Sequence, residues 1–238
     1  ERDAVLTWPQ GNAWLVERLA ASLGDRQRSR SVVSRVAVER HRVVADVWDD
    51  TTQQTQRWSA REVVIAVPLF IAARLIESPP AALSEASAAL RYAPWLVANL
   101  HLNAPLLERV GVPMAWDNVV YGSTALGYVN ARHQNLQAQP HATVLTAYRA
   151  LGVAERIALH DEPWSHWAQR VVAELTPTHP DLAAKLQHID LTRHGHAMSL
   201  PAPGVRGHAA LAALAHGGTA PRLHFAHSDL AGYSVFEE

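Results

Sequence analysis

The last stretch of the chain, residues 222–238, constrains the fold most, because it combines a short strand with the start of a helix. Residues 223–226 form a largely apolar run typical of a buried strand. Polar residues and a glycine interrupt it over 228–232, and residues 233–238 predict the first turn of a helix. Such a helix N-terminus presents free backbone N–H groups and a partial positive charge to a ligand. We therefore expect a strand–turn–helix corner in which the helix is cut after one turn.

A second constraint lies in the first third of the chain, where residues 31–39 and 42–48 are rich in valine. Two β-branched runs separated by a polar pair are typical of a hairpin, and residues 57–60 predict a short return strand. Residues 62–67, Glu-Val-Val-Ile-Ala-Val, are almost wholly apolar, which is typical of a strand buried on both faces. The sequence predicts a helix directly after it, over residues 69–76.

The middle of the chain alternates further strands with amphipathic helices. In the first of these strands, residues 95–102, the apolar positions 96, 98, 100 and 102 share one face. The strands are predicted at 95–102, 115–121, 125–131, 142–149 and 189–196, and the main helix at 163–175. The fold class predicted is therefore α+β, with a mainly antiparallel sheet, its helices, and part of a second layer.

Composition excludes several classes of function. The chain has 238 residues and a net charge of −1, and no basic block marks it as a nucleic-acid or membrane-surface protein. No apolar run approaches the roughly 18–20 residues of a membrane span. The chain has no cysteine, which excludes disulfides, thiolate catalysis and Cys-ligated zinc. A protein without cysteine suits a reducing compartment, so we expect a cytoplasmic location.

The C-terminal stretch also carries a family resemblance. Residues 225–229, Phe-Ala-His-Ser-Asp, followed by Gly-Tyr at 232–233 and Phe-Glu-Glu at 236–238, resemble the flavin signature of the amine-oxidase-like FAD oxidoreductases. A Pro-Gln-Gly turn at residues 9–11, the valine hairpin and the strand Val-Val-Ile-Ala-Val-Pro follow in that family's order. The resemblance covers nearly all of the chain. It implies an enzyme that oxidises a small organic substrate by hydride transfer to FAD.

The resemblance also implies a division into domains. Residues 1–78 would be a partial FAD-binding domain of a Rossmann-like layer, made of a helix, the hairpin and the buried strand. Residues 79–198 would form the substrate-binding domain. Residues 199–238 would return to the FAD-binding domain and end at the flavin-facing helix.

The family pattern implies contacts with FAD at both ends of the chain. Val33 takes the position whose backbone N–H and C=O hold the adenine edge, and Asp229 would lie near the ribose or the ribityl chain. The backbone amides of Ser234, Val235 and Phe236 would face the flavin. Two alternatives remain at this stage: Val33 is a core residue, and the C-terminal stretch is an ordinary strand–helix corner.

On the substrate side, many amine oxidases place a lysine that holds a water beside the flavin, and Asn99 or a neighbour aligns with that position. This departure puts lysine-assisted oxidation, and an amine substrate, in doubt. His194 and His196 belong to a stretch that resembles the family's strand over the flavin, so they are candidates for the substrate side. Trp95 and Trp116 are further candidates for the substrate pocket. Each of these residues has an alternative role as a core or surface side chain. We expect no metal site, because no carboxylate lies at a metal-ligand spacing such as H-E-x-x-H.

Two motifs are absent from the sequence. No G-x-G-x-x-G turn, which seats the FAD pyrophosphate, occurs in it. We therefore expect a fragment that is inactive by itself and binds no FAD, the cofactor belonging to the full-length protein. G-x-S-x-G is also missing, which argues against a hydrolase. The expected partner is a small-molecule substrate, and the sequence specifies no oligomeric state. The alternative function is a non-catalytic α+β domain that binds a ligand or a protein partner.

Overall fold

The computed structural model describes residue 8 and residues 10–108, 111–112, 115–134, 141–217 and 220–232. The chain forms two compact units. We call Asp25–Tyr92 together with Met198–Glu238 the hairpin unit, and Glu1–Gly24 together with Ala93–Ala197 the five-stranded unit.

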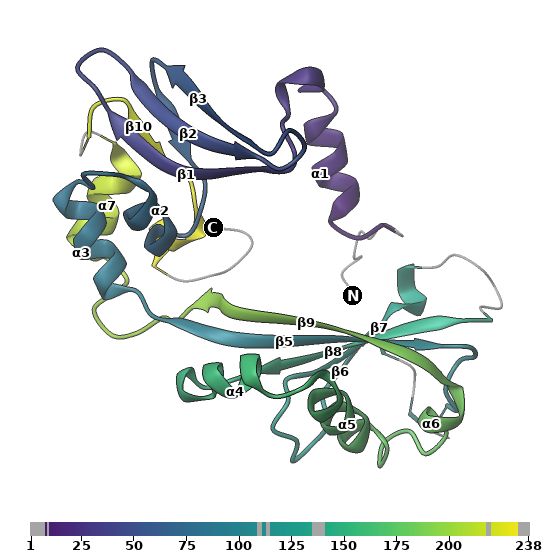
Figure 1. Ribbon diagram of the computed structural model, residues 1–238. Coiled ribbons are helices and arrows are strands. Elements are labelled where there is room, and N and C mark those ends of the chain that lie inside the picture. Colours follow the sequence, from purple (N-terminus) through teal and green to yellow (C-terminus); the bar gives the residue numbers. More distant parts are fainter. Residues whose placement is uncertain are drawn as a thin grey trace, which may run out of the picture. The chain divides into compact units, whose positions relative to one another are not determined.

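In its described residues, the hairpin unit contains two small sheets and three α-helices (Figure 1). The valine-rich runs form the predicted antiparallel hairpin, which a third strand extends. The second sheet is a parallel pair of strands far apart in the sequence. The strands are β1 (Ser31–Val38), β2 (Val43–Asp49) and β3 (Gln54–Ala60) in one sheet and β4 (Val63–Ile65) with β10 (Leu223–Phe225) in the other; the helices are α2 (Leu69–Leu75), α3 (Ala81–Ala89) and α7 (Ala209–His216).

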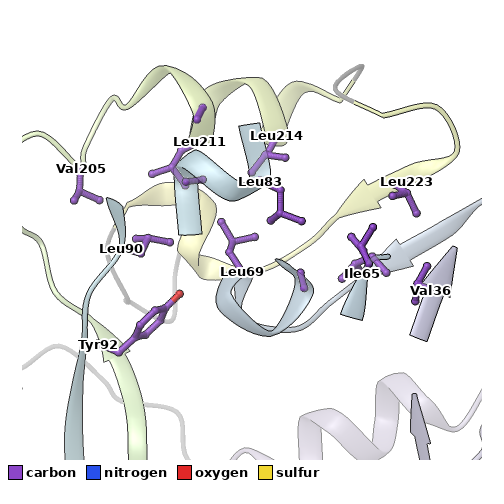
Figure 2. Packing of buried hydrophobic residues seen from close by; sticks show 14 of the residues in the cluster. Val36, Ile65, Leu69, Leu83, Leu90, Tyr92, Val205, Leu211, Leu214 and Leu223 are labelled. Atoms are coloured by element: carbon purple, nitrogen blue, oxygen red, sulfur yellow. The ribbon is translucent and has the colours of Figure 1, made fainter. Parts of the chain in front are cut away.

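One apolar core holds the hairpin unit together (Figure 2). Helices α2, α3 and α7 contribute Leu69, Leu83 and Leu214, each at most 1% exposed. The strands add Val36 from β1 and Leu223 from β10 to the same cluster. Burial of this apolar surface is the main force that joins the early and the late part of the chain.

The strand at residues 62–67 corrects one expectation. It is shorter than predicted, and only one of its faces is buried: Ile65 is 7% exposed, whereas Val64 is 62% exposed. Successive side chains of a strand point to opposite faces, so Ile65 reaches the core while Val64 faces away from it. The prediction that this strand is buried on both faces was therefore wrong.

The five-stranded unit is built on a sheet with the strand order β6-β7-β8-β5-β9, in which β6 pairs with β7, β7 with β8 and β8 with β5, all antiparallel. The helices α4, α5 and α6 lie on one side of this sheet (Figure 1). The strands are β5 (Tyr92–Leu102), β6 (Asp117–Asn118), β7 (Gly127–Asn130), β8 (Thr143–Ala150) and β9 (Leu186–Ser199); the helices are α1 (Ala13–Ala20), α4 (Arg156–Asp161), α5 (Trp164–Leu175) and α6 (Leu182–Lys185).

The alternation in β5 explains why this sheet has one helix-covered face. Leu96, Ala98, Leu100 and Leu102 are at most 1% exposed and pack with Trp167 of α5. The positions between them are half-buried and belong to the opposite face. The predicted α+β class with an antiparallel sheet is confirmed. The assignment of a Rossmann-like FAD layer stays a prediction.

The compact units and the predicted domains divide the chain at different places. The units change at Gly24/Asp25, at Tyr92/Ala93 and at Ala197/Met198, whereas the sequence suggested 78/79 and 198/199. The boundary at Tyr92/Ala93 lies later than 78/79 because Leu83, Ala86 and Leu90 of the α3 segment pack into the core of the hairpin unit. The roles assigned to these segments stay predictions. None of the helices in the described part of the chain is long and apolar enough to cross a membrane.

Candidate functional site

Asp229 is the most deeply buried charged residue of the predicted cofactor end. It lies in the single turn of 3-10 helix, Ser228–Ala231, that follows β10, and it is 0% exposed. Its Oδ2 accepts a hydrogen bond from the backbone N–H of Leu69 (2.9 Å), at the start of α2. The same oxygen accepts the hydroxyl proton of Tyr92 (2.5 Å). These hydrogen bonds join the loop after β10 to α2 and to Tyr92, the last residue of the unit's first segment.

Tyr92 and His227 are two further side chains in contact with Asp229. Burial, and then the hydrogen bond to Asp229, raise the pKa of Tyr92, so its hydroxyl remains a donor. The Nδ1 of His227 accepts from the backbone N–H of Asp229 (3.1 Å). The same Nδ1 also lies 3.3 Å from Oδ2 of Asp229.

The second carboxylate oxygen of Asp229 has a different status. Oδ1 is buried and has no hydrogen-bond partner among the residues that the structure describes. A carboxylate oxygen without a donor carries a desolvation cost, which a ligand hydroxyl would offset. Because the group is fully buried, such a hydroxyl must displace the atoms that cover it.

Val33 lies on β1, which is an edge strand of its sheet, and its side chain is 39% exposed. The backbone N–H of Asp50 donates to the carbonyl of Arg30 (2.9 Å), and Val33 pairs with Val47. Hydrogen-bonded and non-hydrogen-bonded pairs alternate along an antiparallel ladder, which makes the pair of Val33 a non-hydrogen-bonded one. The backbone N–H and C=O of Val33 therefore face the outer edge of β1.

The predicted substrate residues Trp95 and Asn99 lie on the face of the five-stranded sheet opposite its helices. We call this face, defined by Trp95, Val97, Asn99 and His101 of β5, the second face. Asn99 pairs with Thr146 of β8 and accepts a hydrogen bond from its hydroxyl (2.8 Å). Asn99 is therefore held in place by the adjacent strand.

His194 and His196 of β9 belong to the same face. Gly195, between them, points toward α4, because a Cβ placed there would lie 2.6 Å from Nε2 of His160. Alternation then directs His194 and His196 to the opposite side, where both are exposed. Since β9 is the neighbour of β5, the structure brings Trp95, Asn99 and the two histidines to one face.

Trp116 does not join them. It immediately precedes β6, the strand at the other edge of the sheet, and β7 and β8 separate β6 from β5. Ser234, Val235 and Phe236 lie outside the described residues. The site roles of all these residues stay predictions.

The only lysine of the chain is held away from the second face. The ammonium group of Lys185 at the end of α6 lies 2.6 Å from Oδ2 of Asp181 and donates to the carbonyl of Pro105 (2.5 Å). The hydrogen bond to Pro105 holds α6 against the loop after β5. That Asn99 or a neighbour takes the place of the family's lysine stays a prediction.

The sequence did not indicate a pocket of about 550 Å³ at the β6–β7 edge of the five-stranded unit. Tyr128 of β7 and His179 line it, and the hydroxyl of Tyr128 lies 2.6 Å from Nε2 of His179. Leu106 and Val120 add apolar walls. The loops that form the pocket carry no periodic pattern, which explains why sequence reasoning missed it.

Comparison with known proteins gives one family and a common fold. The sequence pattern of the family described as flavin containing amine oxidoreductase matches residues 1–237. No curated protein sequence matches the chain.

Solved structures share the fold at low sequence identity. Cyclohexylamine oxidase from Brevibacterium oxydans IH-35A superposes with a TM-score of 0.66 at 14% identity, over 93% of this chain and 48% of that one. Putrescine oxidase bound to putrescine gives 0.65 at 16%, over 94% and 49%. A putative protoporphyrinogen oxidase from Exiguobacterium sp. 255-15 gives 0.65 at 14%, over 93% and 47%. The chain spans about half the length of these structures.

Proposed function

We propose, on the premise that the chain belongs to the family of flavin containing amine oxidoreductases, that it forms part of an FAD-dependent oxidoreductase acting on a small organic substrate. The observation that carries this proposal is the extent of the family match, from residue 1 to residue 237. The match spans both compact units, so it does not rest on one common motif. In this proposal the hairpin unit and residues 1–24 belong to the FAD-binding domain, and residues 93–197 of the five-stranded unit belong to the substrate domain.

Two features of the hairpin unit fit FAD. The outward backbone groups of Val33 offer one donor and one acceptor, which suits the edge of an adenine ring. The unpartnered Oδ1 of Asp229 suits a ribose or ribityl hydroxyl. The amides of Ser234, Val235 and Phe236 complete the proposed set at the flavin end.

FAD, when bound, supplies the hydride acceptor, and the chain supplies binding and orientation. The second face of the five-stranded sheet combines an indole, an amide and imidazoles, and we assign it to the substrate side. Asn99 can donate or accept a hydrogen bond there but carries no charge. Its hydrogen bond with Thr146 fixes its orientation, so it positions a substrate or a water without acting as a base.

The names of the similar solved structures suggest which substrate classes to test first. The names of two of them state cyclohexylamine and putrescine as their amines, and a third names protoporphyrinogen. Small amines are therefore the first class to test for this chain. Uncharged organic substrates are the second class, because Asn99 or a neighbour is predicted at the position of the family's lysine.

The test is substrate-driven loss of flavin colour in the full-length protein. Under anaerobic conditions, a true substrate reduces the bound flavin and bleaches its visible absorbance, and oxygen restores it. We expect at least one amine or neutral small molecule to do this. A protein that carries no flavin, or whose flavin no compound of either class bleaches, would overturn the proposal. A colourless protein that binds a ligand would favour the non-catalytic alternative.

A further inference from the structure

We propose that His101, His188 and Asp190 form a binding site for a divalent transition-metal ion, with Zn²⁺ and Cu²⁺ as the fitting ions. The three residues lie on the second face of the five-stranded sheet, on the neighbouring strands β5 and β9. This site is inferred without the proposed flavin chemistry, although it lies on the face assigned to the substrate side. It also replaces the expectation that the chain has no metal site.

The three side chains converge. One ligand atom from each residue lies within 4.8 Å of the other two. The Nε2 of His101 is 2.9 Å from Oδ2 of Asp190, and the Nε2 of His188 is 3.5 Å from the same oxygen. The imidazole rings are stacked with their centroids 4.0 Å apart.

These separations match those of ligands that share one metal ion. With metal–ligand distances of about 2.0–2.1 Å, two ligands lie about 2.9 Å apart at an octahedral right angle and about 3.3 Å apart at a tetrahedral angle. The distances of 2.9 and 3.5 Å in the structure lie at the lower end of this range and just above its upper end. The ring planes differ by 13°, so the nitrogen lone pairs, which lie in those planes, are nearly parallel in the structure. To share one ion, the rings have to rotate about χ2, a soft torsion in histidine.

The donor set selects the class of ion. Two imidazoles and one carboxylate suit Zn²⁺, Cu²⁺ and Ni²⁺, whereas Ca²⁺ and Mg²⁺ prefer oxygen donors. The side chains of His101, His188 and Asp190 are 34%, 57% and 62% exposed. The ion would therefore keep open positions for water or an exogenous ligand, as metal sites with three protein ligands do.

The sheet prepares this arrangement. His188 and Asp190 are two residues apart on β9 and so point the same way, and His101 faces them from β5. Ligands on adjacent strands are positioned more precisely than ligands on loops. An alternative is that the trio is only a stacked, hydrogen-bonded surface cluster, and the experiment distinguishes the two.

The experiment is calorimetric titration of the untagged full-length protein with ZnCl₂, followed by electron paramagnetic resonance with Cu²⁺. We expect one ion per chain at this site and nitrogen hyperfine structure from two imidazoles. His101→Gln, His188→Gln and Asp190→Asn should each weaken binding more than about tenfold. Circular dichroism checks that each variant remains folded.

His194→Gln is the matched control, because His194 is an exposed histidine on the same strand and the same face, outside the trio. It should leave the affinity unchanged. Asp190→Asn separates the two alternatives, since an amide still accepts a hydrogen bond from imidazole but is a poor metal ligand. The proposal is overturned if the protein binds neither ion, if the three variants bind as the wild type does, or if His194→Gln weakens binding equally.

Discussion

Asp229 determines how the C-terminal loop is held. One oxygen accepts from the Leu69 N–H and from the Tyr92 hydroxyl, both buried with it in the hairpin unit. Buried donors that lose their acceptor retain the full cost of desolvation. The carboxylate therefore stabilises the fold whether or not a cofactor binds beside it.

Asp229→Ala is expected to lower the free energy of unfolding by about 2–5 kcal/mol, because it leaves two buried donors without an acceptor. Tyr92→Phe should cost less, about 1.5–3 kcal/mol, because the buried Leu69 N–H keeps its acceptor. Asp50→Ala is the control: its ion pair with Arg30 is exposed, and its loss should cost at most about 1 kcal/mol. Urea unfolding measures all three. Equal costs for Asp229→Ala and Asp50→Ala would contradict the structural role.

Val33 is expected to act through its backbone. Val33→Pro removes the N–H that faces the outer edge of β1, and proline is tolerated at such edge positions. It should weaken FAD binding by the full-length protein at least about tenfold, a loss of roughly 1.4 kcal/mol, typical of one hydrogen bond. Val33→Ala keeps the backbone groups and should bind FAD as the wild type does. If both variants bind equally, Val33 does not contact the cofactor.

At the scale of elements, β4 has one buried and one exposed face. Ile65→Ala is expected to cost about 2–5 kcal/mol, because it removes methyl groups from the core of the hairpin unit. Val64→Ala, one residue earlier and exposed, should change stability by no more than about 0.5 kcal/mol. Similar losses for the two variants, measured by chemical denaturation, would show that the assigned faces are wrong.

The α6 segment adds a pH dependence. Burial alone would raise the pKa of Asp181, but hydrogen bonds from Lys185 and from the Leu107 N–H outweigh it and lower the pKa. A carboxyl group whose folded pKa is depressed stabilises the fold above its unfolded pKa of about 3.9 and loses that contribution as the pH falls.

Asp181→Asn should therefore reduce the steepness with which the free energy of unfolding falls between about pH 5 and pH 2. Lys185→Gln should also reduce this steepness, because it removes one of the hydrogen bonds that lower the pKa of Asp181. Denaturant unfolding at a series of pH values checks this. If the free energy of unfolding depends on pH in the same way in the wild type and in both variants, the lowered pKa of Asp181 does not contribute to the stability.

At the scale of the whole molecule, the sequence predicted those elements whose periodicity is strong. The alternation of Leu96, Ala98, Leu100 and Leu102 predicted the buried face of β5, and the valine runs predicted the hairpin. The apolar run at β4 led to the wrong prediction that both faces of the strand are buried, because composition does not reveal which face of a strand is covered. The family resemblance, carried by short motifs, is confirmed by the match over residues 1–237.

Contacts between distant residues could not be predicted. His101 and Asp190 are 89 residues apart, and only the adjacency of β5 and β9 brings them together. The i, i+2 spacing of His188 and Asp190 was the one available signal. Similarly, nothing in the local sequence joins Asp229 to Tyr92, 137 residues earlier.

The FAD content of the full-length protein tests the central claim most directly. The protein is purified, denatured to release any bound cofactor, and the released flavin is identified and quantified against the protein concentration. The account predicts FAD in a stoichiometry of about one per chain, as expected for a single-site cofactor enzyme. A protein that releases no FAD, and binds none when FAD is added, would contradict it.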